Sequence, residues 1–181
     1  MRKKIFVIIL MFNILGFVNS CECPPEKYYD YTSLIVSAYD PVIEQSERMS
    51  IEINIGDKYY LASNANQSRF ANSAYATSTC EKGYAGEKYP LIGISVTSDS
   101  DFNDEFPAGS ELSSIVKVYG TDSNGTYGEG YLNQFTIENT NPGFYFLDLR
   151  PDADPIHIFT VTFEKSNGEF VSVEVPPITW E

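Results

Sequence analysis

The sequence predicts an all-β protein, an antiparallel β-sandwich of about eight or nine strands. The first reason is that apolar and polar residues alternate in many short stretches, as they do in strands that bury one face. The second is that turn residues separate most of these stretches, while helical patterning is nearly absent. The third is the abundance of tyrosine and phenylalanine, 13 and 12 residues, because both favour pleated, half-buried surfaces.

This alternation places the strands in chain order. The clearest strand is 51–55, where three isoleucines alternate with a glutamate and an asparagine. Residues 66–76 are rich in serine and asparagine, and they could form either a short helix or a loop. The expected strands lie at residues 34–38, 51–55, 58–62, 92–96, 115–119, 134–137, 144–149, 159–163 and 171–175.

The last two strands form the best-defined hairpin. Apolar and polar residues alternate in 159–164 and again in 171–175, and the turn between them, 165–169, contains Asn-Gly. Pro176 and Pro177 end the returning strand. This hairpin resembles the final strands of immunoglobulin-like bacterial domains. The resemblance covers about 25 residues and implies an immunoglobulin-like sandwich, but a fold by itself implies no function.

The first 20 residues predict an export signal peptide. Three basic residues at positions 2–4 precede an apolar run, 5–18, which is too short to span a bilayer because a spanning helix needs about 20 residues. The letters VNSC at 18–21 then resemble the lipobox of Bacteroidota-type bacterial lipoproteins. In that family the cysteine carries a diacylglycerol and becomes the new N-terminus.

The lipobox resemblance implies lipid attachment at Cys21 and a location in the bacterial cell envelope, at the outer membrane and on the cell surface. Acidic residues soon after the cysteine resemble those that favour surface display in such lipoproteins. Val18 and Asn19 depart from the usual leucine and small residue of a lipobox. Cleavage after Ser20 by an ordinary secretory peptidase is therefore the alternative.

The three cysteines can be assigned by counting. Lipidation of Cys21 uses the odd thiol, so that Cys23 and Cys80 are the remaining pair. We expect a disulfide between these two, since disulfides persist in exported proteins, although both thiols could stay free. The expected organisation is a signal peptide at 1–20, a short tether at 21–30 and a single β-sandwich domain at 31–181.

The charge of the chain restricts its partners. The formal net charge is −13, and removing residues 1–20, which carry three positive and no negative charges, makes it −16. A strongly acidic chain lacks the clustered basic residues that bind nucleic acid, so we expect no nucleic-acid partner. It is not attracted to anionic lipid either, so membrane attachment would depend on the covalent anchor.

The residues that carry catalytic chemistry are few. By alternation the single histidine, His157, shares a strand face with Phe159 and Val161, which predicts a partly buried position at the sandwich rim. No hydrolase or zinc motif accompanies it. A carboxylate pair for glycoside hydrolysis could exist among 25 acidic residues, although nothing marks one. We therefore expect no catalytic residue, no cofactor and no enzyme activity.

The densest acidic stretch is SDSDFNDE, residues 98–105. Asp99, Asp101 and Asn103 match positions 1, 3 and 5 of a calcium-binding loop. The sixth position holds aspartate instead of glycine, and the twelfth holds serine instead of glutamate. The sequence therefore predicts a solvated loop with no metal site, and a looser calcium site is the alternative.

Two tyrosine clusters are candidates for binding. They are KYYDY at 27–31, beside the tether, and YGEGY at 127–131, which we expect to be a glycine-rich loop. Exposed aromatic residues on loops stack on sugar rings or anchor a protein partner, but they can equally cover the rim of a sandwich.

These observations predict an envelope-anchored lipoprotein that acts as a non-catalytic binding or accessory module at the membrane surface, with a protein or glycan of the envelope as its partner. The alternative is a glycan-binding module that uses loop tyrosines, and a small hydrolase is the third possibility. Exposed coplanar aromatic rings would favour a glycan, and a carboxylate pair in a deep cleft would favour the hydrolase. A flat apolar patch of several hundred Å² would favour a protein partner.

Overall fold

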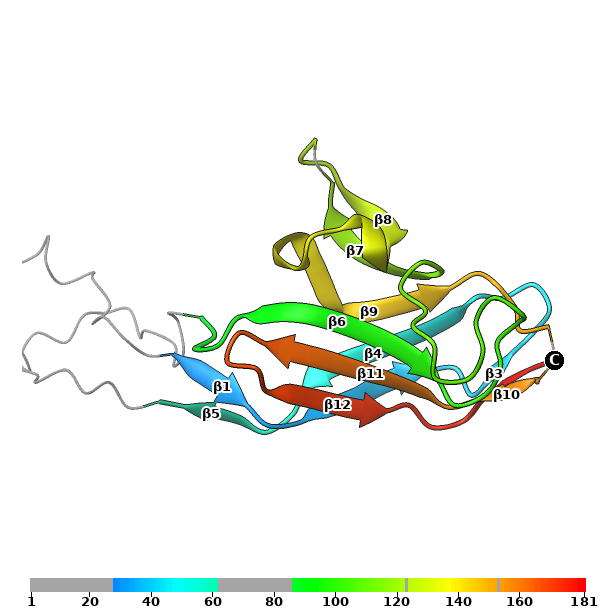
Figure 1. The fold of residues 1–181 in the computed structure, drawn as a ribbon, viewed down its shortest axis with the longest axis horizontal. Coiled ribbons are helices and arrows are strands. Elements are labelled where there is room, and N and C mark those ends of the chain that lie inside the picture. The colour runs from blue at the N-terminus through cyan, green and yellow to red at the C-terminus, as the bar shows by residue number, and fades with distance from the viewer. Residues whose placement is uncertain (1–27, 62–85, 123, 153) are drawn as a thin grey trace, which may run out of the picture. The chain divides into compact units, whose positions relative to one another are not determined.

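The computed structural model describes residues 28–61, 86–122, 124–152 and 154–181. In these ranges the regular structure consists of strands and two short 3-10 helices, with no α-helix, so the all-β prediction is confirmed (Figure 1). The chain divides into two compact units. The first comprises Met1–Asp30 and Tyr59–Lys88, and the second comprises Tyr31–Lys58 and Tyr89–Glu181.

The larger sheet of the second unit has five strands, and all neighbouring strands are antiparallel. In β4 and β7 the residues on one side of the strand are buried, which follows from the alternation of apolar and polar residues in the sequence. In spatial order the strands are β2 (Leu34–Tyr39), β4 (Met49–Ile55), β9 (Thr140–Leu147), β7 (Val116–Thr121) and β8 (Tyr127–Tyr131).

A second antiparallel sheet has the order β12-β11-β6. It contains the predicted closing hairpin, whose turn places Gly168 at φ 83°, a conformation that glycine adopts without strain. The returning strand ends before Pro176, as predicted. The three strands are β6 (Leu91–Ser98), β11 (Phe159–Lys165) and β12 (Phe170–Glu174).

The core lies between the buried faces of these sheets, which pack together as layers (Figure 1). This arrangement is consistent with the predicted β-sandwich, while the immunoglobulin-like order of strands stays a prediction. The buried residues are mostly β-branched and aromatic, because such side chains fill a pleated surface. Among the most deeply buried are Ile51, Val118, Tyr145, Val96, Phe159 and Val161.

A third, short sheet consists of β10 (Ile156–His157), β13 (Ile178–Trp180) and β3 (Val42–Ile43). The strand β13 is antiparallel to β10 and parallel to β3. His157 in β10 is completely buried, and its ring contacts those of Phe102, Phe159 and Trp180. It shares the buried face with Phe159, as predicted, but its expected place at a partly buried rim is wrong.

Two neighbouring sequence predictions are also wrong. Residues 127–131 form the edge strand β8 and not a loop, while the strand expected at 134–137 is replaced by the 3-10 turns η2 (Leu132–Gln134) and η3 (Ile137–Asn139). The Phe135 ring lies so close to Gly130 that a Cβ atom there would come within 2.7 Å of it. Glycine thus allows β8 to stay extended while the following turn folds its aromatic ring against the strand.

In the first unit, the described residues are 28–30, 59–61 and 86–88. The N–H of Tyr29 donates to the carbonyl of Gly86 at 3.0 Å, and the N–H of Lys88 donates to the carbonyl of Tyr29 at 2.9 Å. Tyr29 and Glu87 thereby form a parallel bridge. The strand β1 (Tyr29–Tyr31) pairs with β5 (Lys58–Tyr60). The predicted sites at Cys21, Cys23 and Cys80, and the segment 66–76, lie outside the described residues.

Candidate binding face

Aromatic and charged side chains gather on the outer face of the five-stranded sheet. In the pairing of β7 with β8, Lys117 lies opposite Tyr131 and Tyr119 lies opposite Glu129. These residues alternate with the buried Val116 and Val118, so their side chains project from the other side of the sheet. We call this surface the tyrosine face, and it comprises Tyr119, Tyr127, Tyr131, Phe146, Arg48, Lys117, Glu129 and Asp148.

The aromatic rings of this face are ordered against one another. Tyr119 and Tyr127, which are diagonal neighbours on β7 and β8, have nearly parallel rings at an angle of 14°, with centroids 6.0 Å apart. Phe146 of β9 meets the Tyr119 ring edge-on at 83° and 5.3 Å. The Tyr127 side chain remains 61% exposed, so the outermost ring is available to a ligand.

Four charged side chains lie among these rings, and we call them the charge quartet: Arg48, Lys117, Glu129 and Asp148. Arg48 Nη1 lies 2.8 Å from Glu129 Oε2 and 4.0 Å from Asp148 Oδ1. Lys117 Nζ lies 3.6 Å from Glu129 Oε1 and is also hydrogen-bonded to Asp148 Oδ2. Each cation therefore reaches both carboxylates.

The neighbouring rings also fix the two cations. The guanidinium carbon of Arg48 lies 4.2 Å from the Phe146 ring centre, and Lys117 Nζ lies 5.3 Å from that of Tyr131. The hydrogen bond to Glu129 raises the pKa of Arg48, and the hydrogen bond to Asp148 raises the pKa of Lys117. Both side chains thus stay charged and hold a defined position beside the tyrosines.

Sequence reasoning found only part of this face. The sequence indicated the tyrosine cluster at 127–131 but predicted a loop there. In the structure these tyrosines lie on one side of the edge strand β8. The contributions of Arg48, Lys117 and Phe146 were missed because β4, β7 and β9 are distant in sequence. Alternation in 116–121, where Lys, Tyr and Thr alternate with Val, Val and Gly, was the signal that could have revealed the polar side of β7.

The other tyrosine cluster, 27–31, is described from Tyr28 onward. Tyr29 Oη donates to Glu87 Oε1 at 3.2 Å within the first unit. Burial, followed by the charge of Glu87, raises the pKa of Tyr29 to about 12. Tyr31 is buried in the second unit. Tyr29 and Tyr31 are therefore each engaged within their own unit.

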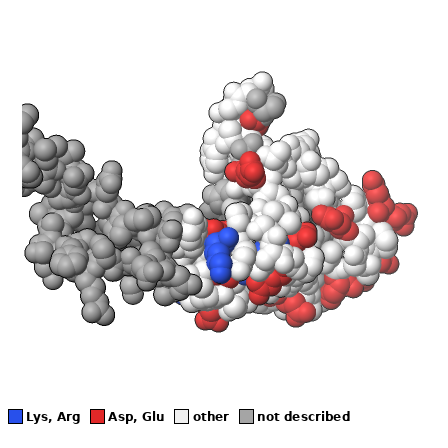
Figure 2. Space-filling view, turned by 60° about the vertical axis from the view of Figure 1, so that its left-hand side comes forward, with Lys and Arg blue, Asp and Glu red and all other residues white. Residues whose placement is uncertain are grey.

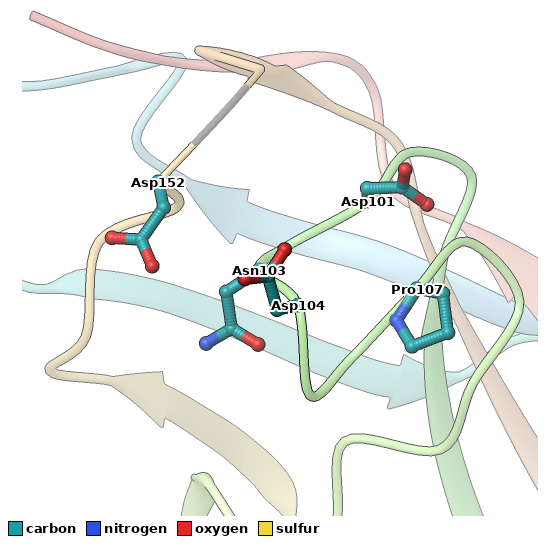
Figure 3. Close-up of a pocket in the computed structure, with 5 residues that line it drawn as sticks. All are labelled: Asp101, Asn103, Asp104, Pro107 and Asp152. Carbon is teal, nitrogen blue, oxygen red and sulfur yellow. The ribbon is translucent and has the colours of Figure 1, made fainter.

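The acidic stretch 98–105 borders an open hollow of about 430 Å³, in which Asp152, from the segment after β9, faces Asn103 and Asp104 (Figure 3). The three residues at calcium-loop spacing are already used as acceptors inside the protein. Asp99 Oδ1 accepts from the Ile158 N–H at 2.8 Å, and Asp101 Oδ1 accepts from the Ala108 N–H at 2.7 Å. Asn103 Oδ1 accepts from the N–H groups of Glu105 and Phe106.

These bonds shape the loop, and each engages the Oδ1 atom of its side chain. In the part of the chain that the structure describes, no three histidine, cysteine or acidic side chains are grouped as metal ligands would be.

His157 forms the other polar cluster of chemical interest. Its Nδ1 lies 2.7 Å from Ser98 Oγ, and its Nε2 lies 2.8 Å from the carbonyl oxygen of Asp154. Since a carbonyl only accepts, Nε2 carries a proton, and in the neutral ring Nδ1 accepts from the serine hydroxyl. A serine next to an imidazole is a nucleophile–base geometry, but both side chains are buried. The pair therefore joins β6 to β10 inside the core.

Comparison with known proteins does not identify a function for these sites. No protein-family model matches the chain, and no curated protein or solved structure is significantly similar to it. None of the helices among the described residues is long and apolar enough to cross a membrane. The function must therefore be argued from the sites themselves.

Proposed function

We propose that the chain is a lipid-anchored, non-catalytic binding module of a bacterial cell envelope, and that the tyrosine face is its glycan-binding site. The observation that carries this proposal is the pair of nearly parallel rings of Tyr119 and Tyr127 beside the charge quartet, of which the Tyr127 ring is largely exposed. The anchor is the lipobox-like Cys21, which is argued from the sequence alone.

A sugar ring has two requirements that this face meets. Its C–H surfaces are apolar and flat, so they pack against exposed aromatic rings such as Tyr127. Its hydroxyl groups need both donors and acceptors at the rim of the aromatic contact, because a polar group that loses water without a new partner costs binding energy. Arg48 and Lys117 provide donors, and Glu129 and Asp148 provide acceptors.

The same geometry supports the two other candidate functions less well. A protein partner favours a contiguous apolar patch, but here the rings are interleaved with charged side chains. A hydrolase needs two carboxyl groups that face a bound substrate. Glu129 and Asp148 are instead both paired with cations on an open sheet face.

The proposal is tested by affinity electrophoresis of the full-length protein through native gels that contain soluble polysaccharides. We expect at least one polysaccharide to retard the protein, and Tyr127→Ala to weaken this binding about tenfold, since a lost aromatic contact is worth roughly 1 kcal/mol or more. The matched control is Phe170→Ala on β12, where an aromatic side chain is similarly exposed (64%) on the other sheet. Equal effects of the two substitutions, or no retardation by any polysaccharide, would refute the proposal.

A further inference from the structure

We infer that the ligand of the tyrosine face is an uncharged polysaccharide, bound along β8 through an internal stretch of its chain. This inference rests on the proposed glycan-binding function and specifies its ligand class. It follows from the charge balance of the face and from the arrangement of its side chains along an edge strand.

The charge quartet is internally neutral. It contains two cations and two carboxylates, and each cation reaches both carboxylates within 4.0 Å. No unit of positive charge is left over to attract a sulfate or a uronate. In addition, the net charge of the whole chain is −13, and Figure 2 shows acidic side chains spread over the face in view, with basic side chains gathered in one place. An acidic polymer would be repelled by this field.

The charged groups of the quartet are better placed to hydrogen-bond a ligand that contacts them than to attract a charged ligand from solution. Arg48 is held over the Phe146 ring, and its Nη1 donates to Glu129 Oε2 at 2.8 Å. Groups that are fixed before binding lose little further freedom when a hydroxyl group is added to the network. Such contacts are directional and short-ranged, so binding of an uncharged sugar should depend only weakly on salt.

The shape of the face indicates an extended ligand. Tyr127, Glu129 and Tyr131 project from one side of β8, and the strand length between the two tyrosines is about 13 Å at roughly 3.3 Å per residue. Ring, carboxylate and ring thus follow one another along the outermost strand of the sheet. A repeating chain can place one sugar on each ring and hydroxyl groups between them, whereas a single terminal sugar is best enclosed by a concave pocket.

Neutral and acidic polysaccharides distinguish an uncharged ligand of the tyrosine face from a charged one. Mixed-linkage β-glucan, glucomannan, arabinoxylan and dextran serve as neutral probes in affinity gels, and polygalacturonate and alginate serve as acidic ones. We expect one or more neutral polymers to retard the full-length protein, with affinity that changes less than about twofold between low and physiological salt, while the acidic polymers have no effect. Affinity for fragments of the neutral polymer should rise with their length.

Charge variants test the balance directly. Glu129→Gln and Asp148→Asn each remove part of a hydrogen-bond acceptor and leave one positive charge in excess within the quartet, so each should weaken binding of the neutral polymer more than the control substitution does. Glu174→Gln is the control, because it removes the same charge from an exposed position on β12.

The outcomes distinguish this inference from the proposed function. If no polysaccharide of either class is bound, both fail. If the wild-type protein prefers polygalacturonate or alginate, or binds a single sugar as tightly as a long fragment, glycan binding stands and the uncharged internal-chain ligand is refuted.

Discussion

The ammonium group of Lys165 donates a hydrogen bond to the backbone carbonyl of Tyr31, a residue 134 positions earlier in the chain. Both residues are buried, and Lys165 Nζ also lies 4.4 Å from the Tyr31 ring centre and 2.9 Å from Glu169 Oε2. A buried ammonium group is tolerated only where such partners replace its water. The turn of the closing hairpin is thereby joined to the strand β1, through which the chain enters the sandwich.

The first prediction concerns this contact. Lys165→Met keeps most of the aliphatic volume but removes the donor to the Tyr31 carbonyl. We expect the free energy of unfolding to fall by about 1–3 kcal/mol, which is the usual cost of removing a buried hydrogen-bond partner. Denaturant unfolding measures it as a lower midpoint with an unchanged slope.

Glu169→Gln is the matched control for the same contact. Glutamine keeps a side-chain oxygen that can accept from Lys165, and solvent screens the carboxylate of Glu169, which is 43% exposed, so this substitution should cost less than Lys165→Met. If Lys165→Met costs no more than Glu169→Gln, the buried contact with Tyr31 does not stabilise the fold.

The second prediction concerns Tyr145 of β9, whose hydroxyl is buried and has no hydrogen-bond partner among the described residues. Tyr145→Phe removes this hydroxyl and keeps the ring. Because the unpaired group is costly to bury, we expect stability to rise by about 1 kcal/mol. Tyr31→Phe, at another buried tyrosine of the same core, should give no comparable gain. A loss of stability in Tyr145→Phe would show that the hydroxyl is satisfied in solution.

The third prediction is the alkaline behaviour of the same residue. Burial, with a smaller contribution from Tyr31, raises the pKa of Tyr145 well above its ordinary value of 10.0. The folded state therefore keeps a proton that the unfolded chain releases. The contribution of this hydroxyl to the free energy of unfolding is fully present below pH 10.0. It falls as the pH rises above that value, by about 1.4 kcal/mol per pH unit for one proton. Tyr145→Phe should lose this part of the slope in unfolding measured between about pH 10 and 12, and an unchanged slope would contradict the assignment.

The sequence predicts those features of the fold that are encoded within a single strand. Alternation identified 51–55 and the hairpin at 159–175 correctly, because buried and exposed faces repeat every two residues within one strand. The strand prediction at 134–137 failed because alternation over so short a run does not distinguish a strand from a turn. These residues turn instead, and the Phe135 ring packs against Gly130, five residues earlier.

The candidate site shows the same limit. The cluster 127–131 was visible in the sequence, but the quartet joins β7 and β8 to the residues that adjoin the start of β4 and the end of β9, and no periodicity within one strand reveals which strands are neighbours. The burial of His157 was underestimated for a similar reason, because the Phe102 and Trp180 rings that cover it come from distant segments.

The fourth prediction is that the loop 98–105 holds no tight calcium site. Asp99, Asp101 and Asn103 already accept backbone N–H groups, and calcium would have to compete with these bonds. Calorimetric titration with calcium at physiological salt should show no binding heat. A micromolar dissociation constant that Asp101→Ala abolishes would contradict this prediction.

The last prediction joins the proposed anchor to the fold: Cys21 carries a diacylglycerol, and Cys23 is bonded to Cys80. Tyr29 and Glu87 form a parallel bridge, and Cys23 precedes Tyr29 by six residues while Cys80 precedes Glu87 by seven. Nearly equal lengths of chain thus lead from the bridged pair to the two thiols. The disulfide further requires that the Cα atoms of Cys23 and Cys80 approach within about 7 Å of each other.

Mass spectrometry of the protein from its own envelope should show a diacylglyceryl group on Cys21, and peptide mapping without reductant should show Cys23 linked to Cys80. Cys80→Ser should lower the free energy of unfolding by about 2–4 kcal/mol, because the linked loop restricts the unfolded chain. It should also speed proteolysis near residues 26–28 while the sheets survive, since a released tail opens locally. Alkylation of both Cys23 and Cys80 in the native, unreduced protein would exclude the disulfide, and an unmodified Cys21 would exclude the anchor. If both bonds are found, only Glu22 separates the lipid-bearing residue from the residue fixed to the fold, so the domain would be held close to the membrane surface.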